Sequence, residues 1–369
     1  MAVNNADFLF SVLEDYNPKL QELFWVKHPL LDAIVTKKQF EQHKLEGTHR
    51  TFGTYTQGPG TVTKISTGNE TINGGRKNLG HKGNEYTSRM IYAFDVPINE
   101  LDAANGKMDI VKLLEKYPEA GMDDFMLRIN KQMALGNGGA GEVDGFVTLN
   151  GETVYNPSTA VGNRTGIFSF AAPASQTSTV HGIVKQGDTN GVEGWYNQYG
   201  DISAFSTDGL YKMRQVYFAC SRQGKANRAP DMMFGDELSY LNYLDTLTQT
   251  VRTPISTGED LVRKNTREYA DFHDSKFYLD TDIDISNATL SGTPAENGLI
   301  YMLQSAVWEF FYYTANKHEE GGSGKPNIFR PRPPFRIPTK DQMRFELVLD
   351  ANIDCTSLRE NGVVTGGAA

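Results

Sequence analysis

Cysteines and long apolar runs are both scarce in this chain. Its 369 residues include two cysteines, Cys220 and Cys355. No run approaches the roughly 18 apolar residues that a membrane-spanning helix needs. The cysteine count excludes a disulfide framework and fits two buried thiols in a reducing compartment. Residues 1–15 lack the basic region and cleavage site of a signal peptide. We therefore expect a soluble protein, made in the cytoplasm, with no membrane partner.

Basic residues are also outnumbered by acidic ones. The chain has 36 lysines and arginines against 45 aspartates and glutamates, which gives a net charge of −9. A dedicated nucleic-acid binder carries a basic surface, so this balance argues against that class. The seven histidines show no HExxH or similar ligand spacing. We expect no metal site, no cofactor and surface or hydrogen-bonded histidines.

Catalytic and ligand-binding motifs are absent or incomplete. Gly136, Gly138 and Gly141 match G-x-G-x-x-G, but they follow a predicted helix, whereas a dinucleotide site needs them between a strand and a helix. Residues 321–325 resemble the end of a phosphate loop that lacks its first glycine and its Ser/Thr. No G-x-S-x-G motif occurs, and Cys220 has no assignable histidine partner. We predict no catalytic residues and no enzyme activity.

An acidic repeat near position 280 has the spacing of a calcium loop. Asp280, Asp282 and Asp284 alternate, but the sixth position is Ile285 and the twelfth is Ser291, so the turn glycine and bidentate glutamate are missing. Alternation of acidic and apolar residues favours an exposed edge strand instead.

One long segment has few apolar residues and many glycines. Residues 47–88 hold seven hydrophobic side chains and nine glycines. Ordering each residue costs about 1 to 2 kcal/mol of backbone entropy, which so few apolar groups do not offset. The segment has a charge of +3, so the rest of the chain carries −12. A basic arm on an acidic body suggests docking onto neighbouring copies. A surface loop or flexible linker is the alternative that composition leaves open.

The pattern inside and after this segment predicts a long β-hairpin. Residues 51–55 alternate in polarity, and residues 58–60, Gly-Pro-Gly, suit a turn. The return strand is predicted from apolar residues that recur with period two before a proline: Met90, Tyr92, Phe94, Val96 and then Pro97. Residues 7–35, before the segment, have the pattern of short helical pieces in an N-terminal arm.

Three stretches have the spacing of amphipathic helices. The first is predicted to end at Gly136 and carries Met122, Phe125, Met126, Ile129 and Met133 at helix spacing. The second is predicted to begin at a cap, Ser206 or Thr207, and carries Leu210, Met213, Tyr217 and Cys220 on one face. The third is marked by Leu238, Leu241 and Leu244. A strand over 231–234 between the last two makes a compact α+β layer.

Further strands are predicted along the rest of the chain. They cover residues 143–149, 166–171, 179–184, 276–285, 299–303, 309–313 and 342–349. Strand-rich and helix-rich stretches alternate without a steady βα period, which argues against a doubly wound sheet.

Two stretches, together with the order of these elements, carry a resemblance to a known family. Residues 208–247, DGLYKMRQVYFACSRQGKANRAPDMMFGDELSYLNYLDTL, contain a helix, a short basic loop and an R-x-P-D strand before another helix. Residues 269–280, YADFHDSKFYLD, precede a further strand over 297–301. In this order they resemble the major capsid proteins of tailed bacteriophages with the HK97 fold. The resemblance extends over almost the whole chain.

The resemblance implies an α+β, HK97-like capsid fold with four parts. These are an N-terminal arm (1–46), an extended hairpin loop (47–98), a peripheral domain with a long spine helix (99–136 and 266–369) and an axial domain (137–265). It further implies hexamers and pentamers of an icosahedral virion shell, which is assembled in the cytoplasm of a bacterial host. The shell encloses double-stranded DNA without sequence-specific binding.

The hairpin loop is expected to lie across the adjacent subunit. Apolar contacts and strand pairing should dominate there, since exposed ion pairs contribute only about 0 to 1 kcal/mol each. The candidate contact residues are Phe52, Tyr55, Val62, Lys64, Ile65, Ile72, Arg76, Lys77 and Lys82.

Other partners are implied by the family as well. Because only 46 residues precede the loop, a separate scaffolding protein is expected, together with a portal and a decoration protein. No lysine-to-asparagine cross-link is predicted. An encapsulin-like compartment shell is an alternative to the virion. A soluble nucleotide-binding enzyme is an alternative of another class, suggested only by the glycine cluster and the acidic repeat.

Overall fold

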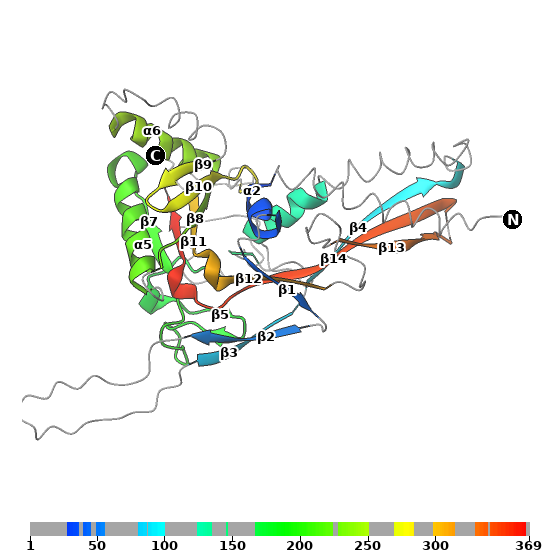
Figure 1. The fold of residues 1–369 in the computed structure, drawn as a ribbon, viewed down its shortest axis with the longest axis horizontal. Coiled ribbons are helices and arrows are strands. Elements are labelled where there is room, and N and C mark those ends of the chain that lie inside the picture. Colours follow the sequence, from blue (N-terminus) through cyan, green and yellow to red (C-terminus); the bar gives the residue numbers. More distant parts are fainter. Residues whose placement is uncertain are drawn as a thin grey trace, which may run out of the picture.

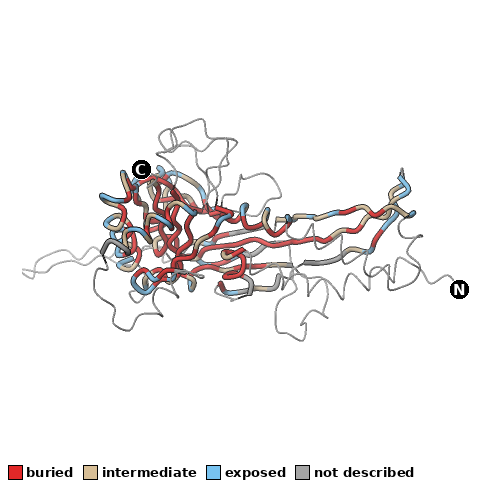
Figure 2. The backbone as a smooth tube through the Cα atoms, turned by 90° about the horizontal axis from the view of Figure 1, so that it is seen from above, coloured by how far each residue is buried: buried red, intermediate tan, exposed pale blue. Residues whose placement is uncertain are grey.

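The described part of the chain is elongated, with a lobe of helices and short strands at one end and a long sheet that extends away from it (Figures 1 and 2). This computed structural model describes residues 28–36, 40–45, 49–55, 80–86, 88–99, 124–134, 145–146, 167–223, 228–250, 269–283, 298–313, 329–338 and 340–366. None of the helices within these ranges combines the length and the hydropathy of a membrane span.

A six-stranded sheet forms the centre of the lobe, in the order β7-β15-β11-β8-β10-β9. The strands are β7 (Gln198–Asp201), β8 (Met232–Gly235), β9 (Tyr269–Phe272), β10 (Ser275–Leu279), β11 (Leu299–Leu303) and β15 (Gly362–Thr365). Every residue of β8, β11 and β15 is buried. Strands that are covered on both faces read as continuous apolar runs, as MMFG in β8 and LIYML in β11 do.

Two helices pack on this sheet: α5 (Leu210–Gln223) lies against β7 and β15, and α6 (Glu237–Thr250) lies against β10. They enclose a core cluster that includes Met213 and Tyr243. A Cβ atom on Gly200 would lie 2.7 Å from Cγ2 of Val216, and one on Gly362 would lie 2.5 Å from its Cγ1. These two glycines therefore allow the close approach of α5 to the sheet.

A second sheet forms the extended part of the molecule, in the order β1-β12-β14-β13. Its central strand, β14 (Gln342–Cys355), pairs with β4 (Ser88–Pro97) and β13 (Phe329–Arg336) through its first part. Its last part pairs with β12 (Trp308–Tyr313), and β1 (Glu41–Leu45) adds a parallel strand to β12. Strand β14 therefore holds this sheet together, because it pairs directly with β4, β12 and β13.

Cross-strand ion pairs join β4 and β14. Arg89 lies opposite Asp350, and its Nε donates to Oδ1 at 2.5 Å. Arg344 lies opposite Asp95 and donates from Nε and Nη2 at 2.7 and 2.9 Å. This bidentate hydrogen bonding lowers the pKa of the Asp95 carboxyl. These opposite charges at paired positions favour the observed register of β4 on β14. Shifting β4 by one residue would place the two partners of each ion pair on opposite faces of the sheet.

An aromatic cluster joins the two sheets. Phe146 and Phe168 pack on Tyr301 of β11 and Trp308 of β12, with ring centroids 5.0 to 5.8 Å apart. Phe40 stacks on Trp308 at 5.5 Å. Because β11 and β12 belong to different sheets, this cluster fixes the sheets relative to each other. Figure 2 shows the buried backbone concentrated in the lobe and continuing along the strands that leave it.

Short elements complete the described chain. Two two-stranded antiparallel sheets are β2 (His49–Tyr55) with β3 (Gly80–Tyr86), and β5 (Thr179–Val180) with β6 (Ile183–Val184). Near the beginning, α2 (Pro29–Leu31) continues into a π-helical turn, η1 (Asp32–Thr36). A helix covers residues 124–134. The remaining turns are η2 (Pro173–Ser175), η3 (Phe205–Gly209), η6 (Ser305–Val307) and η7 (Leu358–Glu360).

The structure confirms the α+β class and most predicted elements. Helix 124–134, α5 and α6 lie where apolar residues recur at helix spacing, and β8, β11 and β12 differ from their predicted bounds by no more than one residue. Both cysteines are buried free thiols, as expected. Strand β14 continues to Cys355, beyond the predicted end. Most of the N-terminal arm and of the predicted strand 143–149 lies outside the described residues.

The predicted return strand of the hairpin is wrong. Strand β2 pairs with β3, whereas the apolar alternation of residues 90–96 belongs to β4, which pairs with β14. The sequence of β3, GHKGNEY, is polar and glycine-rich, so it carries no period-two apolar signal. The strand that pairs with β2 is β3, which begins at Gly80, earlier than the sequence indicates.

The predicted cap of α5 is also wrong. The chain enters this helix through η3, and the residue before the turn is Ala204, so neither Ser206 nor Thr207 caps it. The carboxylate of Asp208 reaches back and accepts a hydrogen bond of 3.2 Å from the N–H of Ala204. Residues 167–171, predicted as a strand, are irregular, and the strand predicted over 276–285 ends at Leu279.

Candidate functional site

Three of the nine predicted contact residues lie in the described part of the hairpin. Phe52 and Tyr55 are on β2, and Lys82 is on β3. The side chain of Lys82 is exposed, whereas Phe52 is 6 % exposed. The other six lie outside the described residues: Val62, Lys64, Ile65, Ile72, Arg76 and Lys77.

Phe52 packs on its own chain. Its ring meets that of His181 edge-on at a centroid distance of 5.4 Å, and it covers Gly83, its cross-strand partner. A Cβ atom on Gly83 would lie 2.7 Å from Cζ of Phe52, so glycine leaves the room that the ring needs. The prediction that the hairpin has no support from its own chain is therefore wrong at its base. Phe52 is not an exposed contact residue.

The receiving surface for Phe52 is the tight turn between β5 and β6. His181 and Gly182 occupy this turn with φ angles of 52° and 77°, a combination typical of a type I′ turn. A histidine with positive φ is uncommon, and here the turn places its ring against Phe52. The sequence VHGIV indicates a turn, but it does not indicate that the turn contacts Phe52.

A buried polar cluster holds helix α2, the first element of the described chain. Asn130, on helix 124–134, donates from Nδ2 to both carboxylate oxygens of Asp280 at 3.1 and 3.0 Å and to Oδ2 of Asp282 at 2.8 Å. Its Oδ1 accepts a hydrogen bond of 3.2 Å from the N–H of Leu31. The N–H of Leu30 donates to Asp280. These acceptors satisfy N–H groups of α2 that have no partner within the helix.

Both aspartates contradict the predicted exposed edge strand. Asp280 is 0 % exposed and Asp282 is 8 % exposed, in the turn that follows β10. Burial raises the pKa of the Asp280 carboxyl to about 6, although its hydrogen bond with Asn130 opposes this shift. Nδ1 of His28 lies 2.6 Å from Oδ2 of Asp282 and completes the cluster. The two buried aspartates thus hold residues 28–31 through contacts with His28 and the N–H of Leu30.

A buried lysine organises the irregular residues 167–171. Lys185 Nζ donates to the backbone oxygen of Ile167 at 2.9 Å and to Oδ1 of Asn197 at 3.1 Å. Burial lowers the pKa of Lys185 to about 7. Oδ1 of Asn197 also accepts from the N–H of Ser169 at 2.8 Å. Side chains here bind backbone groups that a strand ladder would otherwise pair, which explains why the predicted strand is absent.

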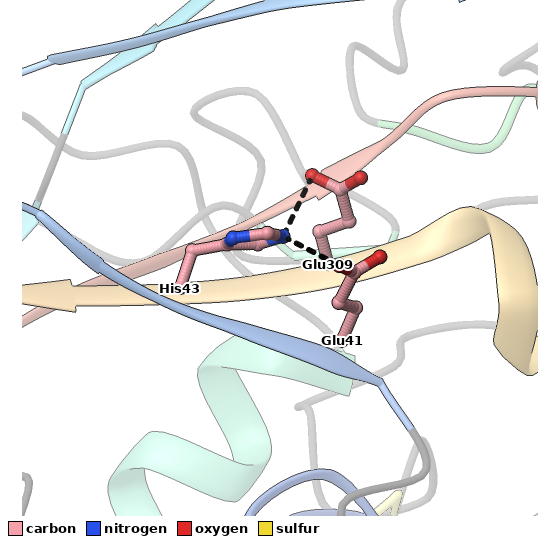
Figure 3. A group of neighbouring side chains, drawn as sticks. All are labelled: Glu41, His43 and Glu309. Atoms are coloured by element: carbon pink, nitrogen blue, oxygen red, sulfur yellow. Dashed lines mark ion pairs between the residues drawn. The ribbon is translucent and has the colours of Figure 1, made fainter.

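Figure 3 shows three side chains with the chemistry of metal ligands: Glu41 and His43 of β1, and Glu309 of β12. Nε2 of His43 lies 3.4 Å from Oε1 of Glu41 and 3.7 Å from Oε2 of Glu309. One imidazole and two carboxylates can bind a divalent cation. The group also has a purely structural explanation, since the imidazole lies beside two carboxylates that face each other in register and repel. The group therefore carries no functional assignment.

Comparison with solved structures identifies the fold. The chain is similar to the capsid chain of cyanophage A-1(L), with a TM-score of 0.53, 13 % sequence identity and coverage of 92 % of this chain and 93 % of that one. At this identity the likeness shows a shared fold. It confirms the predicted capsid fold, while the four parts assigned to it stay predictions.

Two further structures match with lower TM-scores. The capsid of a native GTA particle has a TM-score of 0.49 and 9 % identity, with 90 % of each chain covered. An encapsulin complex from Synechococcus elongatus has a TM-score of 0.49 and 8 % identity, with 90 % of this chain and 86 % of that chain covered. No protein-family model and no curated protein sequence matches the chain.

Proposed function

We propose that this chain is the major capsid protein of a tailed phage or phage-like particle, a structural subunit that assembles with copies of itself into a closed shell. The observation that carries this proposal is the shared fold with the cyanophage A-1(L) capsid chain over 92 % of this chain and 93 % of that one. Because the match covers both chains almost completely, no large region is left over for a separate enzymatic function.

The finer features of this shell are part of the proposal. The subunits form hexamers and pentamers of an icosahedral wall around double-stranded DNA, with a separate scaffolding protein, a portal and a decoration protein as further partners. Assembly takes place in the cytoplasm of the bacterial host, and the mature protein is located in the virion. The net charge of −9 supports a wall that contains DNA without binding each phosphate.

The hairpin is the proposed arm between neighbouring subunits. Phe52 fixes the base of the hairpin on the chain's own body. Lys82 is exposed on the same base. The remaining proposed contact residues are Tyr55, Val62, Lys64, Ile65, Ile72, Arg76 and Lys77. Their contacts with a neighbour would supply the apolar burial that this glycine-rich segment lacks.

Expression in bacteria, with and without a scaffolding protein from the same genome, tests the shell. Lysate is separated on a density gradient, and the fast-sedimenting fraction is imaged by negative-stain electron microscopy. We expect closed shells, and a chain that is monomeric under both conditions contradicts the proposal. Nucleic acid that survives nuclease treatment supports a virion, whereas co-purified cargo enzyme supports the encapsulin-like alternative.

A segment replacement tests the hairpin. Residues 58–72 are replaced by a glycine-serine segment of equal length, which should abolish shells while circular dichroism of the chain stays unchanged. The matched control replaces residues 251–265, which follow α6, in the same way. If the hairpin replacement assembles as well as the control, the proposed arm is wrong.

A further inference from the structure

Helix α5 has an exposed face that is basic and aromatic. Its sequence, LYKMRQVYFACSRQ, contains three basic residues and no acidic one. Arg214, Phe218 and Arg222 recur at intervals of four residues, and all three are exposed. At 1.5 Å per residue the two arginines are roughly 12 Å apart along the helix axis, with Phe218 midway. Tyr211, which is 67 % exposed, extends this face towards the start of the helix.

Helix α6 has a face of the same spacing and the opposite charge. Its sequence, ELSYLNYLDTLTQT, contains two acidic residues and no basic one. Glu237, Leu241 and Asp245 recur at intervals of four residues, and all three are exposed. The pattern Arg-x3-Phe-x3-Arg on α5 therefore has the same length as Glu-x3-Leu-x3-Asp on α6. The apolar residue lies at the centre of both patterns, and the flanking charges are opposite.

Among the described residues, the charged groups of the two faces are not paired with each other. The ring of Phe218 meets that of His273 at a centroid distance of 5.3 Å, and Nε of Arg222 donates to the backbone oxygen of Phe218 at 3.3 Å. The helices lie over different parts of the sheet, α5 against β7 and β15 and α6 against β10, and their other faces enclose the shared core cluster. No ion pair among the described residues involves the two arginines of the α5 face or the two acids of the α6 face.

The same faces carry exposed apolar side chains. Of the five large hydrophobic residues that are exposed in the described part of the chain, three lie here: Tyr211, Phe218 at 49 % and Leu241 at 48 %. Exposed aromatic and aliphatic groups flanked by charges are typical of the centre and rim of a protein interface. The complementary charge pattern indicates what covers them, namely the other helix of a second copy.

We propose that α5 of one copy packs against α6 of the next copy. This inference rests on the proposed shell function, because it names the contact between neighbouring subunits. Arg214 and Arg222 then face Glu237 and Asp245, and Phe218 packs on Leu241. Each pattern is symmetric about its apolar residue, so the pairing is satisfied whichever way the second helix runs. Because each copy uses two different faces, the contact is head to tail. Repeating it generates a closed ring if the rotation between neighbouring copies divides a full turn evenly.

Charge reversal tests the electrostatic part of this contact. The full chain with R214E and R222E, or with E237R and D245R, places like charges opposite each other. We expect each double variant to lower the assembled fraction by about tenfold or more, measured by sedimentation velocity. The chain with all four changes restores opposite charges and should recover assembly. A fourfold variant that assembles no better than the double variants, with unchanged circular dichroism, contradicts the pairing.

The matched control reverses charges elsewhere. Lys131→Glu with Lys340→Glu changes the net charge as much as the arginine reversals do, at exposed positions outside α5 and α6. Assembly of this variant should stay within a factor of about two of the unchanged chain. If it falls as far as the R214E, R222E variant does, the effect reports net charge and not the helix pairing.

A cysteine pair tests the apolar centre of the contact. Phe218→Cys and Leu241→Cys in one chain should give, on mild oxidation, a ladder of disulfide-linked chains that ends at the ring size. Either change alone should give no ladder, because the contact joins position 218 to position 241. Cys220 and Cys355 are buried and do not compete.

The outcomes separate this inference from the shell function. Shells without a ladder overturn the helix pairing and leave the shell intact. A ladder without shells supports the pairing and overturns the shell. Dimers from the Phe218→Cys variant alone show that α5 meets α5, and they overturn the head-to-tail contact. The absence of both ladder and shells overturns both proposals.

Discussion

Asn130 donates from one amide nitrogen to two buried aspartates, to Asp280 at 3.0 Å and to Asp282 at 2.8 Å. The same side chain accepts from the N–H of Leu31. One residue of helix 124–134 thus joins the N-terminal segment to the turn after β10. Two carboxylates in a buried site are tolerated because a shared donor lies between them.

Replacing Asn130 by aspartate is expected to be strongly destabilising. The change is nearly isosteric, but it removes the shared donor and adds a third carboxylate. We expect the free energy of unfolding to fall by about 3 kcal/mol or more, measured by urea unfolding of the unassembled chain. Asn99→Asp makes the same chemical change at an exposed position and should cost less than about 0.5 kcal/mol. Equal effects of the two changes would show that the bridge is unimportant.

The pKa of Asp280 gives a pH dependence of stability with a defined sign. Its pKa is raised from 3.8 to about 6, so the native state binds this proton more tightly than the unfolded state. The resulting stabilisation is full below 3.8 and is lost as the pH rises through about 6. The whole change is about 3 kcal/mol. Relative to Asp280→Asn, the unchanged chain should lose up to this amount between about pH 4 and about pH 7. A pH-independent difference argues against the raised pKa.

Lys185 should give the opposite dependence in a higher range. Its pKa is lowered from 10.5 to about 7, so its contribution to stability is full above 10.5 and is lost as the pH falls through about 7. Compared with Lys185→Met, the unchanged chain should lose at most about 5 kcal/mol over this range, measured by urea unfolding at several pH values. Lys340→Met, at an exposed position, should show no such trend. A flat difference for Lys185→Met would mean that the amine stays charged.

Phe52→Ala is expected to loosen the base of the hairpin. Truncation removes the contact with His181, so hydrogen exchange in β2 and β3 should increase while α5 stays protected. The expected loss in the free energy of local opening is about 3 kcal/mol. Phe335→Ala, at an exposed position of β13, is the control and should leave exchange in β2 and β3 unchanged. Unchanged exchange in the unassembled Phe52→Ala chain would mean that Phe52 acts only between subunits.

Elements with a local signal could be predicted from the sequence. Helix α5 carries Met213, Tyr217 and Cys220 at helix spacing, and β11 is a short apolar run. The polar strand β3 lacks such a signal, because glycine and charged residues can form a ladder without an apolar face. The alternating aspartates after β10 led to the wrong prediction of an exposed strand. Acidic residues at every second position occur in this buried turn just as they would on an exposed strand.

Most of the candidate site depends on contacts between distant residues. Asn130 and Asp280 are 150 positions apart, and nothing near either residue indicates the other. The contact of Phe52 with His181 joins two hairpins in the same way. The opposite charges of α5 and α6 are visible in the sequence, but which of their residues are exposed becomes apparent only when the helices are placed on the sheet.

Cryo-electron microscopy of the purified native assembly shows directly whether this chain forms a closed shell. We expect a closed shell whose wall density accommodates this fold in every subunit, arranged as hexamers and pentamers. A preparation that contains only the 41.0 kDa monomer, or a particle whose wall does not accommodate the fold, would contradict the account.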